Sequence, residues 1–246
     1  MKILTTKSNL MLSAFAFLAI SLSSCKKDEA VSITEDDAAD IISSTMARPV
    51  GGSADDASEL SRFARVNIFI PGPGRKWLEC GQTKDTTFQR TITSGLFTAT
   101  HTHSITATLN CENQKPSSLV WTGNITGTFD GPKMSGNSTG VRNWTLTGFG
   151  PDQSLPLVLN GTVSRNGVRT SKIRNQYTFE TNVNHTYTNV TIDKATDKIT
   201  GGTGTVSAVI KVSNGNTRTY EGTIVFNGDD TATLTINGRV FTIQLN

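Results

Sequence analysis

Three histidines are the residues of this chain whose types and spacing could support chemistry. His101 and His103 stand two positions apart in an alternating run, so both imidazoles point to the same face of an expected strand. His185 lies in a second strand-like run, 183–192. If the two runs were neighbours, the imidazoles could hold zinc with an open position for water, as in a metal-assisted hydrolase. The alternative, that they are hydrogen-bonded or solvated residues of an amphipathic strand, is the one we expect, with no cofactor.

Other catalytic patterns are missing from the sequence. There is no Gly-x-Ser-x-Gly elbow, glycine-rich phosphate loop, His-Glu-x-x-His motif or EF-hand loop. We therefore name no catalytic residue and expect a protein that is not an enzyme, with a hydrolase as the alternative. Trp77, Trp121 and Trp144 could form a platform on which sugars stack, but Trp121 falls on an apolar face, which favours a core position.

The strongest targeting signal is at the N-terminus. Two lysines precede an apolar stretch, 10–22, that is interrupted by only two serines and is shorter than the about 20 residues of a membrane span. This pattern predicts a signal peptide over 1–24. Its end, Leu22-Ser23-Ser24-Cys25, resembles a bacterial lipobox, in which Cys25 becomes the first mature residue and receives diacylglycerol. The alternative is an ordinary signal peptide that happens to be followed by a cysteine.

Lipidation of Cys25 would anchor the protein to a membrane and account for the odd number of cysteines. Cys80 and Cys111 then remain as a predicted disulfide in an oxidising compartment. The residue after the lipid is Lys26 and not Asp, which in lipoproteins favours the outer membrane. The charged cluster that follows resembles surface-export signals. We expect an outer membrane lipoprotein that is periplasmic or surface-exposed.

Charge is distributed unevenly along the chain. The formal net charge is +3, and residues 26–62 hold four cations and nine acids. The remainder, 63–246, holds 17 cations and 11 acids. These cations are scattered and not clustered, so we expect no binding to nucleic acid.

Residues 25–74 are predicted to form an acidic tether with short helices. Thr34 and Asp37 have the spacing of a capping box, and apolar residues follow at helical spacing until Pro49 and two glycines. Ser53 with Asp56 repeats the start signal. We interpret the segment as a spacer that holds the next domain off the membrane, with a docking element as the alternative.

A β domain is predicted over 75–246. Its clearest strand is 96–110, where an apolar face that includes both histidines alternates with an almost unbroken series of threonines. Turns are predicted at four Asn-Gly pairs, which tolerate the positive φ of hairpins: 166–167, 214–215, 227–228 and 237–238. Glycines on apolar faces indicate bends or bulges, or the approach of a ligand to the backbone: Gly123, Gly127, Gly161 and Gly222. We predict an all-β antiparallel meander of roughly ten to thirteen strands, forming a strongly curved sheet, sandwich or barrel.

The chain resembles an uncharacterised family of Bacteroidetes-type bacterial lipoproteins. The resemblance rests on the lipobox, the acidic helical tether with its segment 33–39, and the threonine-rich β domain, including 144–148, 159–163 and 233–238. The family implies no activity or site. We expect a lipid-anchored envelope protein whose β domain binds a ligand or forms structure. Its expected partners are the membrane, through the lipid, and an envelope protein, a glycan or an apolar ligand. The alternatives are a hydrolase and a carrier of a lipid or another apolar ligand.

Overall fold

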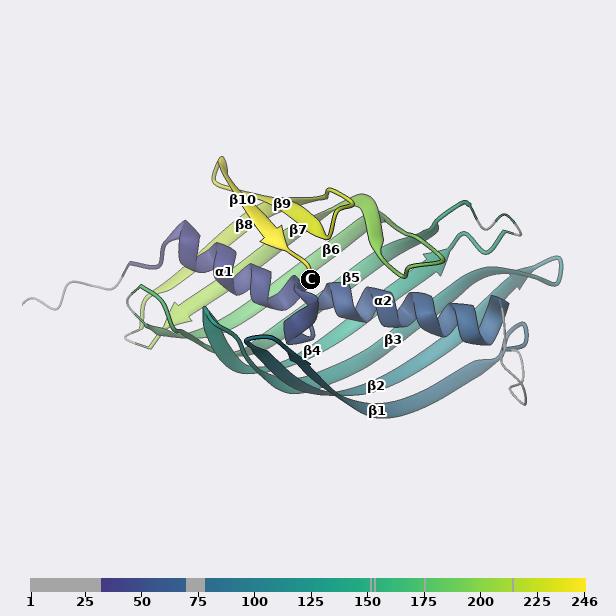
Figure 1. The fold of residues 1–246 in the computed structure, drawn as a ribbon, viewed down its shortest axis with the longest axis horizontal. Helices are drawn as coiled ribbons and strands as arrows, with labels where there is room; N and C mark the ends of the chain where they lie inside the picture. Colours follow the sequence, from purple (N-terminus) through teal and green to yellow (C-terminus); the bar gives the residue numbers. More distant parts are fainter. Residues whose placement is uncertain (1–31, 70–77, 151, 153, 175, 214) are drawn as a thin grey trace, which may run out of the picture. The chain divides into compact units, whose positions relative to one another are not determined.

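The structure is a computed structural model that describes residues 32–69, 78–150, 152, 154–174, 176–213 and 215–246. Ten antiparallel strands form a single sheet whose spatial order follows the sequence, which confirms the predicted all-β meander (Figure 1). The first and last strands are not paired with each other, so the curved sheet stays open. The strands are β1 (Thr83–Ser94), β2 (Phe97–Glu112), β3 (Lys115–Asp130), β4 (Met134–Thr147), β5 (Leu157–Ser171), β6 (Thr178–Ile192), β7 (Ile199–Val212), β8 (Thr217–Phe226), β9 (Thr231–Ile236) and β10 (Arg239–Gln244).

In the described part of the chain, two helices precede the sheet, joined and followed by short turns. They are α1 (Glu35–Met46), the 3-10 turn η1 (Arg48–Val50), α2 (Ser53–Ala64) and the π-helical turn η2 (Arg65–Phe69). The predicted capping box is present, because the Asp37 amide donates to the Thr34 hydroxyl and the Thr34 amide donates to the Asp37 carboxylate. The second helix begins at Ser53 as its start signal predicts, but the N-cap is Gly52 and makes no side-chain cap, so the second capping box is absent. Ser53 instead pairs with the Tyr187 hydroxyl at 2.5 Å.

The helices are part of the core of the β domain. Figure 1 shows α1 and α2 lying end to end across one face of the sheet, which we call the inner face. Ile41, Ile42 and Leu60 are fully buried there. A curved sheet with an apolar inner face needs a cover, and the apolar stripes of the helices supply it. The boundary drawn at residue 74 therefore does not separate compact units, since Val31–Asn246 forms one unit.

Strand alternation follows the predicted pattern on β2. Ala99, Ile105 and Leu109 are buried on the inner face, whereas the threonines between them lie on the opposite, outer face. Two Asn-Gly pairs, 227–228 and 237–238, connect strands as predicted, and Gly215 lies between β7 and β8 while Asn214 is outside the described residues.

The turn predicted at Asn166-Gly167 was wrong, because both residues lie inside β5. A Cβ at Gly167 would be 2.0 Å from the Asn137 carbonyl oxygen, so this glycine permits close approach of two strands. The register of β5 against β6 shifts between Leu159 and Gly161. This irregularity is the kind of bulge that Gly161 was predicted to permit.

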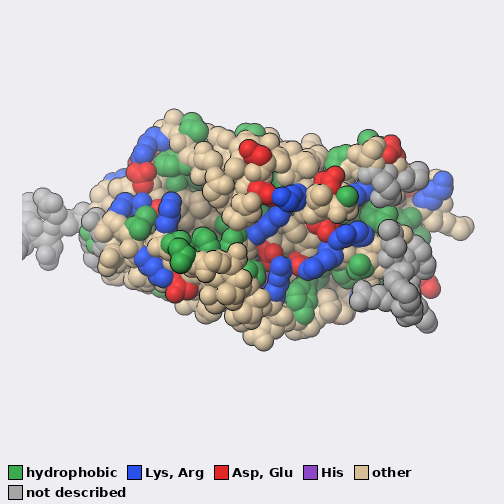
Figure 2. All heavy atoms as spheres, viewed as in Figure 1, with side chains coloured by type: hydrophobic (Ala, Val, Ile, Leu, Met, Phe, Trp, Pro, Cys, Tyr) green, Lys and Arg blue, Asp and Glu red, His purple; other side chains and the backbone are tan. Residues whose placement is uncertain are grey.

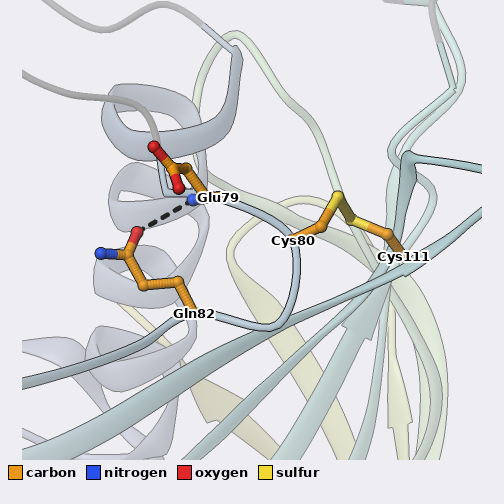
Figure 3. Close-up of a disulfide and its surroundings, with 4 residues drawn as sticks. All are labelled: Glu79, Cys80, Gln82 and Cys111. Carbon is orange, nitrogen blue, oxygen red and sulfur yellow. Dashed lines mark hydrogen bonds between the residues drawn. A yellow bond between two sulfur atoms is a disulfide. The ribbon is translucent and has the colours of Figure 1, made fainter.

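The predicted disulfide joins Cys80, which precedes β1, to Cys111 near the end of β2 (Figure 3). The two Cα atoms are 5.5 Å apart, within the range a disulfide requires. Beside it the Glu79 amide donates to the Gln82 side chain at 2.9 Å (Figure 3). The bridge spans a sequence separation of 31, for which loop-closure entropy gives a stabilisation of about 3–4 kcal/mol. It therefore ties the start of the first strand to its neighbour.

Candidate functional site

The most charged buried region lies where α2 meets the inner face. Asp56, 1 % exposed, accepts hydrogen bonds from Arg142 on β4 at 2.5 Å and from Arg165 on β5 at 2.8 Å. The Arg142 guanidinium also donates to Nδ1 of His103 at 2.9 Å. We call these four residues the Asp56 cluster. It joins the helical segment to two central strands by charge-assisted hydrogen bonds.

Local sequence explains how the cluster fits. Asp56 lies in the first turn of α2, where the helix dipole favours a carboxylate. Gly140 leaves room for Arg165, because a Cβ there would be 2.7 Å from the arginine Cδ. Gly127 likewise makes room for His101, since its Cβ would be 2.2 Å from Nδ1. These inner-face glycines therefore accommodate large polar side chains.

Electrostatics in the cluster favour a charged Asp56. Burial acts to raise its pKa, but the adjacent Arg142 and Arg165 outweigh burial, and the net effect is a lowered pKa. Burial lowers the pKa of Arg165, and Asp56 opposes that shift. The arrangement is a buried ion network in which one carboxylate serves two guanidinium groups. The cluster contains no nucleophile paired with a general base. Its hydrogen bonds attach α2 to β4 and β5.

The three histidines lie on the inner face but do not converge. His101 and His103 are on β2 with ring centroids 6.3 Å apart, whereas His185 is on β6, separated from β2 by three intervening strands. His101 bonds the Val50 carbonyl at 2.9 Å, and His185 bonds the Thr45 hydroxyl at 2.7 Å. Within the described residues no group of three or more His, Cys, Asp or Glu side chains could hold a metal ion. All three histidines contact the helical segment or its ion network.

Each histidine is kept in its neutral form. Burial lowers the pKa of all three, to about 4 for His103 and to about 3 for His185. For His185 the cations Arg165 and Arg169 add to the effect. The residues considered as metal ligands are therefore neutral core residues, bound to the Val50 carbonyl, the Thr45 hydroxyl and the Arg142 guanidinium.

This state predicts a pH dependence that a His185→Phe variant should weaken. An unfolded histidine takes up a proton below about pH 6.5, and the folded one does so only near pH 3, so stability falls as the pH drops through this window. At pH 4.5 the difference is about 2–3 kcal/mol. Urea unfolding at pH 7 and pH 4.5 should show that the variant loses about 2–3 kcal/mol less stability than the wild type. Comparing the two proteins cancels other groups, such as Asp55, whose burial raises its pKa to about 6. Equal losses of stability in the variant and the wild type would contradict the assignment of His185 as a neutral buried histidine.

The core position expected for Trp121 is confirmed, and Trp144 is buried as well, so these two residues do not form a platform for sugars. Trp121 and Trp144 are 2 % and 0 % exposed and form part of the core, and Trp77 lies outside the described residues. Cys25 also lies outside them, so its prediction stands as one from sequence. None of the helices in the described ranges has the length and hydropathy needed to cross a membrane.

Two of the surface hollows are candidates for binding, apart from one of about 460 Å³ beside α2 that Arg62 and Phe63 border. The larger, about 500 Å³, lies on the outer face across β1 to β4 and is bordered by polar side chains such as Asp85, Ser104, Thr106, Asn124 and Asn143. The other, about 250 Å³, is mostly apolar and lies beside α1. Sequence reasoning did not identify either, because each combines side chains from distant segments.

Comparison with protein families, with characterised proteins and with solved structures finds no match to this chain.

Proposed function

We propose that the chain is a lipid-anchored protein of the bacterial cell envelope that binds a polysaccharide through the outer face of its sheet. The leader and the Leu22-Ser23-Ser24-Cys25 sequence support lipid attachment at Cys25. Lys26 after the lipid supports the outer membrane, with the domain facing the periplasm or the cell surface. The membrane is then a partner through the lipid alone.

The observation that carries the proposal is that the inner face is filled by the protein's own helices. Met46 and Leu60 are fully buried against it, and the Asp56 cluster lies between helix and sheet. A filled interior favours a binding scaffold over a carrier that encloses a long lipid. Histidines that do not converge give no support to a metal-assisted hydrolase. The broad surface that remains for a ligand is the outer face.

The chemistry of the outer face suits a neutral, hydroxyl-rich polymer. One row of laterally paired residues crosses β2 to β9 and, apart from one asparagine, contains only threonines. Its members are Thr106, Thr122, Asn143, Thr162, Thr186, Thr205, Thr223 and Thr235. Neighbouring strands are about 4.8 Å apart, so hydroxyls that donate and accept repeat closely along the row. The 500 Å³ hollow lies at the β1 end of this row.

Lipid attachment predicts a change in location for a Cys25→Ser variant. Wild-type protein from a culture fed labelled palmitate should carry the label and sediment with outer membranes. The variant has no thiol to acylate at this position, so it should be unlabelled and recovered in the soluble envelope fraction. Labelled wild-type protein retained at the inner membrane would contradict the outer membrane placement. An unlabelled wild type would remove the anchor from the proposal.

Polysaccharide binding is tested by co-sedimentation of lipid-free protein with purified peptidoglycan sacculi and with extracted surface polysaccharide. We expect binding to one of them. A Ser104→Lys/Asn143→Lys variant places two long cations in the hollow and should weaken binding to the polysaccharide at least tenfold. The matched control, Leu96→Lys/Ala195→Lys, places two cations at exposed turn residues outside both the hollow and the threonine row and should alter binding less than twofold. Failure of the wild type to bind either polymer, or equal loss in both variants, would overturn the proposal.

A further inference from the structure

A small apolar pocket lies beside α1, where the open sheet does not surround the helix. Its volume is about 250 Å³. An apolar cavity of about 150 Å³ takes benzene, so this pocket admits a longer hydrocarbon group. We call it the α1 pocket, and its principal lining residues are Ser43, Ser44, Val50, Phe97, Phe129 and Met134.

Next to the pocket is a buried cation that has no carboxylate partner among the described residues. Arg169 on β5 is 1 % exposed, and its guanidinium donates to the hydroxyls of Ser44 and Thr181. The Nε to Ser44 Oγ distance is 3.0 Å, and Ser44 itself lines the pocket. The Ser44 hydroxyl donates to the Ile41 carbonyl at 2.6 Å and stands between the guanidinium and the pocket, so a carboxylate beside Ser44 reaches Arg169 by replacing this hydroxyl as the acceptor of the Nε hydrogen bond.

The surrounding interior has an excess of positive charge. Arg142 and Arg165 share the single carboxylate of Asp56, and Arg169 adds a third buried guanidinium. Burial lowers the pKa of Arg169 to about 9, so the group remains charged at neutral pH. A charge removed from water without an opposite charge is costly. An anion next to Ser44 would offset that cost.

We propose that the α1 pocket binds a medium-chain carboxylate, with the hydrocarbon tail between Phe97, Phe129 and Met134 and the carboxylate at the Ser44 hydroxyl facing Arg169. The tail meets an apolar lining, and the carboxylate supplies the negative charge that Arg169 does not have among the described residues. This site is separate from the outer face and does not rest on polysaccharide binding.

The rim of the pocket tolerates an anion. Asp40 lines the pocket, but its carboxylate is already paired with Arg174 at 2.5 Å and with Lys133 at 3.3 Å. Lys133 is the rim cation that could bind the carboxylate in the opposite orientation, with the tail still inside. A Lys133 variant therefore distinguishes the two orientations.

The experiment is calorimetric titration of lipid-free protein, residues 26–246, with hexanoate, octanoate and octanol at neutral pH. This chain contains the whole compact unit, Val31–Asn246. Octanoate should bind at least tenfold more tightly than octanol. It should also bind roughly tenfold more tightly than hexanoate, because each buried methylene contributes about fourfold. Equal affinity for octanol and octanoate, or no binding of octanoate at millimolar concentration, would overturn the proposal.

Three variants assign the site. Arg169→Met should reduce octanoate affinity to that of octanol without lowering the thermal midpoint, because it replaces a buried, uncompensated charge by an apolar side chain. Met134→Trp should fill the pocket and abolish binding of both ligands. The matched control, Lys133→Met, removes an exposed cation from the rim and should change octanoate affinity less than threefold. A large loss in Lys133→Met with none in Arg169→Met would overturn the assigned orientation, and unchanged binding in Met134→Trp would overturn the site.

Discussion

A chain that starts at Leu78, and so lacks both helices, is expected to be insoluble or unfolded and to regain a folded state when a peptide of residues 32–69 is supplied. Without the helices the apolar inner face would be exposed to water, which leads to aggregation. Co-expression of the two pieces, followed by gel filtration and circular dichroism, measures the rescue. A folded, monomeric product from residues 78–246 alone would contradict this prediction.

The size of the effect follows from what the helical segment buries. Five of its large apolar side chains are at most 1 % exposed: Ile33, Ile41, Ile42, Met46 and Leu60. Burial of one such side chain contributes about 1.5–3 kcal/mol, so together they contribute on the order of 10 kcal/mol. The net stability of a domain is only about 5–15 kcal/mol. Removing the helical segment should therefore abolish most or all of the net stability of the domain. A peptide with Leu60→Asp is the control, because it should fail to rescue.

Replacing Asp56 by Asn should have the largest effect of any single charge change. The amide keeps the shape of the side chain but leaves Arg142 and Arg165 buried without a carboxylate. Breaking a buried ion pair in this way costs about 3–5 kcal/mol. The matched control is Asp36→Asn, whose carboxylate pairs with Arg239 at the surface and should contribute less than about 1 kcal/mol. Urea unfolding of the two variants measures both values.

The Asp56 carboxylate also predicts an acid dependence. Its folded pKa is lower than its unfolded value, so its contribution is fully present above about pH 4 and is lost as the pH falls through the folded pKa. The Asp56→Asn variant should therefore lose less stability than the wild type between pH 4 and pH 2. Similar unfolding midpoints for Asp56→Asn and Asp36→Asn at neutral pH would show that the cluster does not hold the helices.

Strands were more predictable from the sequence than the packing of the helices. Alternation on β2 depends on neighbours two residues apart, and the turn at Asn237-Gly238 depends on two adjacent residues with positive φ. Such local signals do not depend on the rest of the fold. Asn166-Gly167 shows the limit, because its glycine is needed for contact with Asn137 on another strand.

The Asp56 cluster could not be predicted from spacing, since Arg142 and Arg165 are 86 and 109 residues away from Asp56. One signal was present in the charge distribution. Residues 26–62 carry an excess of acids and the rest of the chain an excess of cations. In the fold, acids of the helical segment pair with cations of later segments. Figure 2 shows acidic and basic side chains side by side on the helix-covered face. The pairs between helices and later segments include Asp36–Arg239, Asp37–Arg174, Asp40–Lys133, Asp55–Arg90 and Asp56–Arg142.

The helical segment contacts residues that lie far later in the sequence. Tyr220 donates to the Ile33 carbonyl across a sequence separation of 187, and the Arg48 amide donates to the carbonyl of Leu245, the penultimate residue. Contacts of this range make folding slow, on the millisecond-to-second scale, because long loops must close before they form. The helices leave the ribosome before the sheet and remain without their full cover until β10 is made. A stop codon before β9 would therefore leave α1 without part of its binding surface.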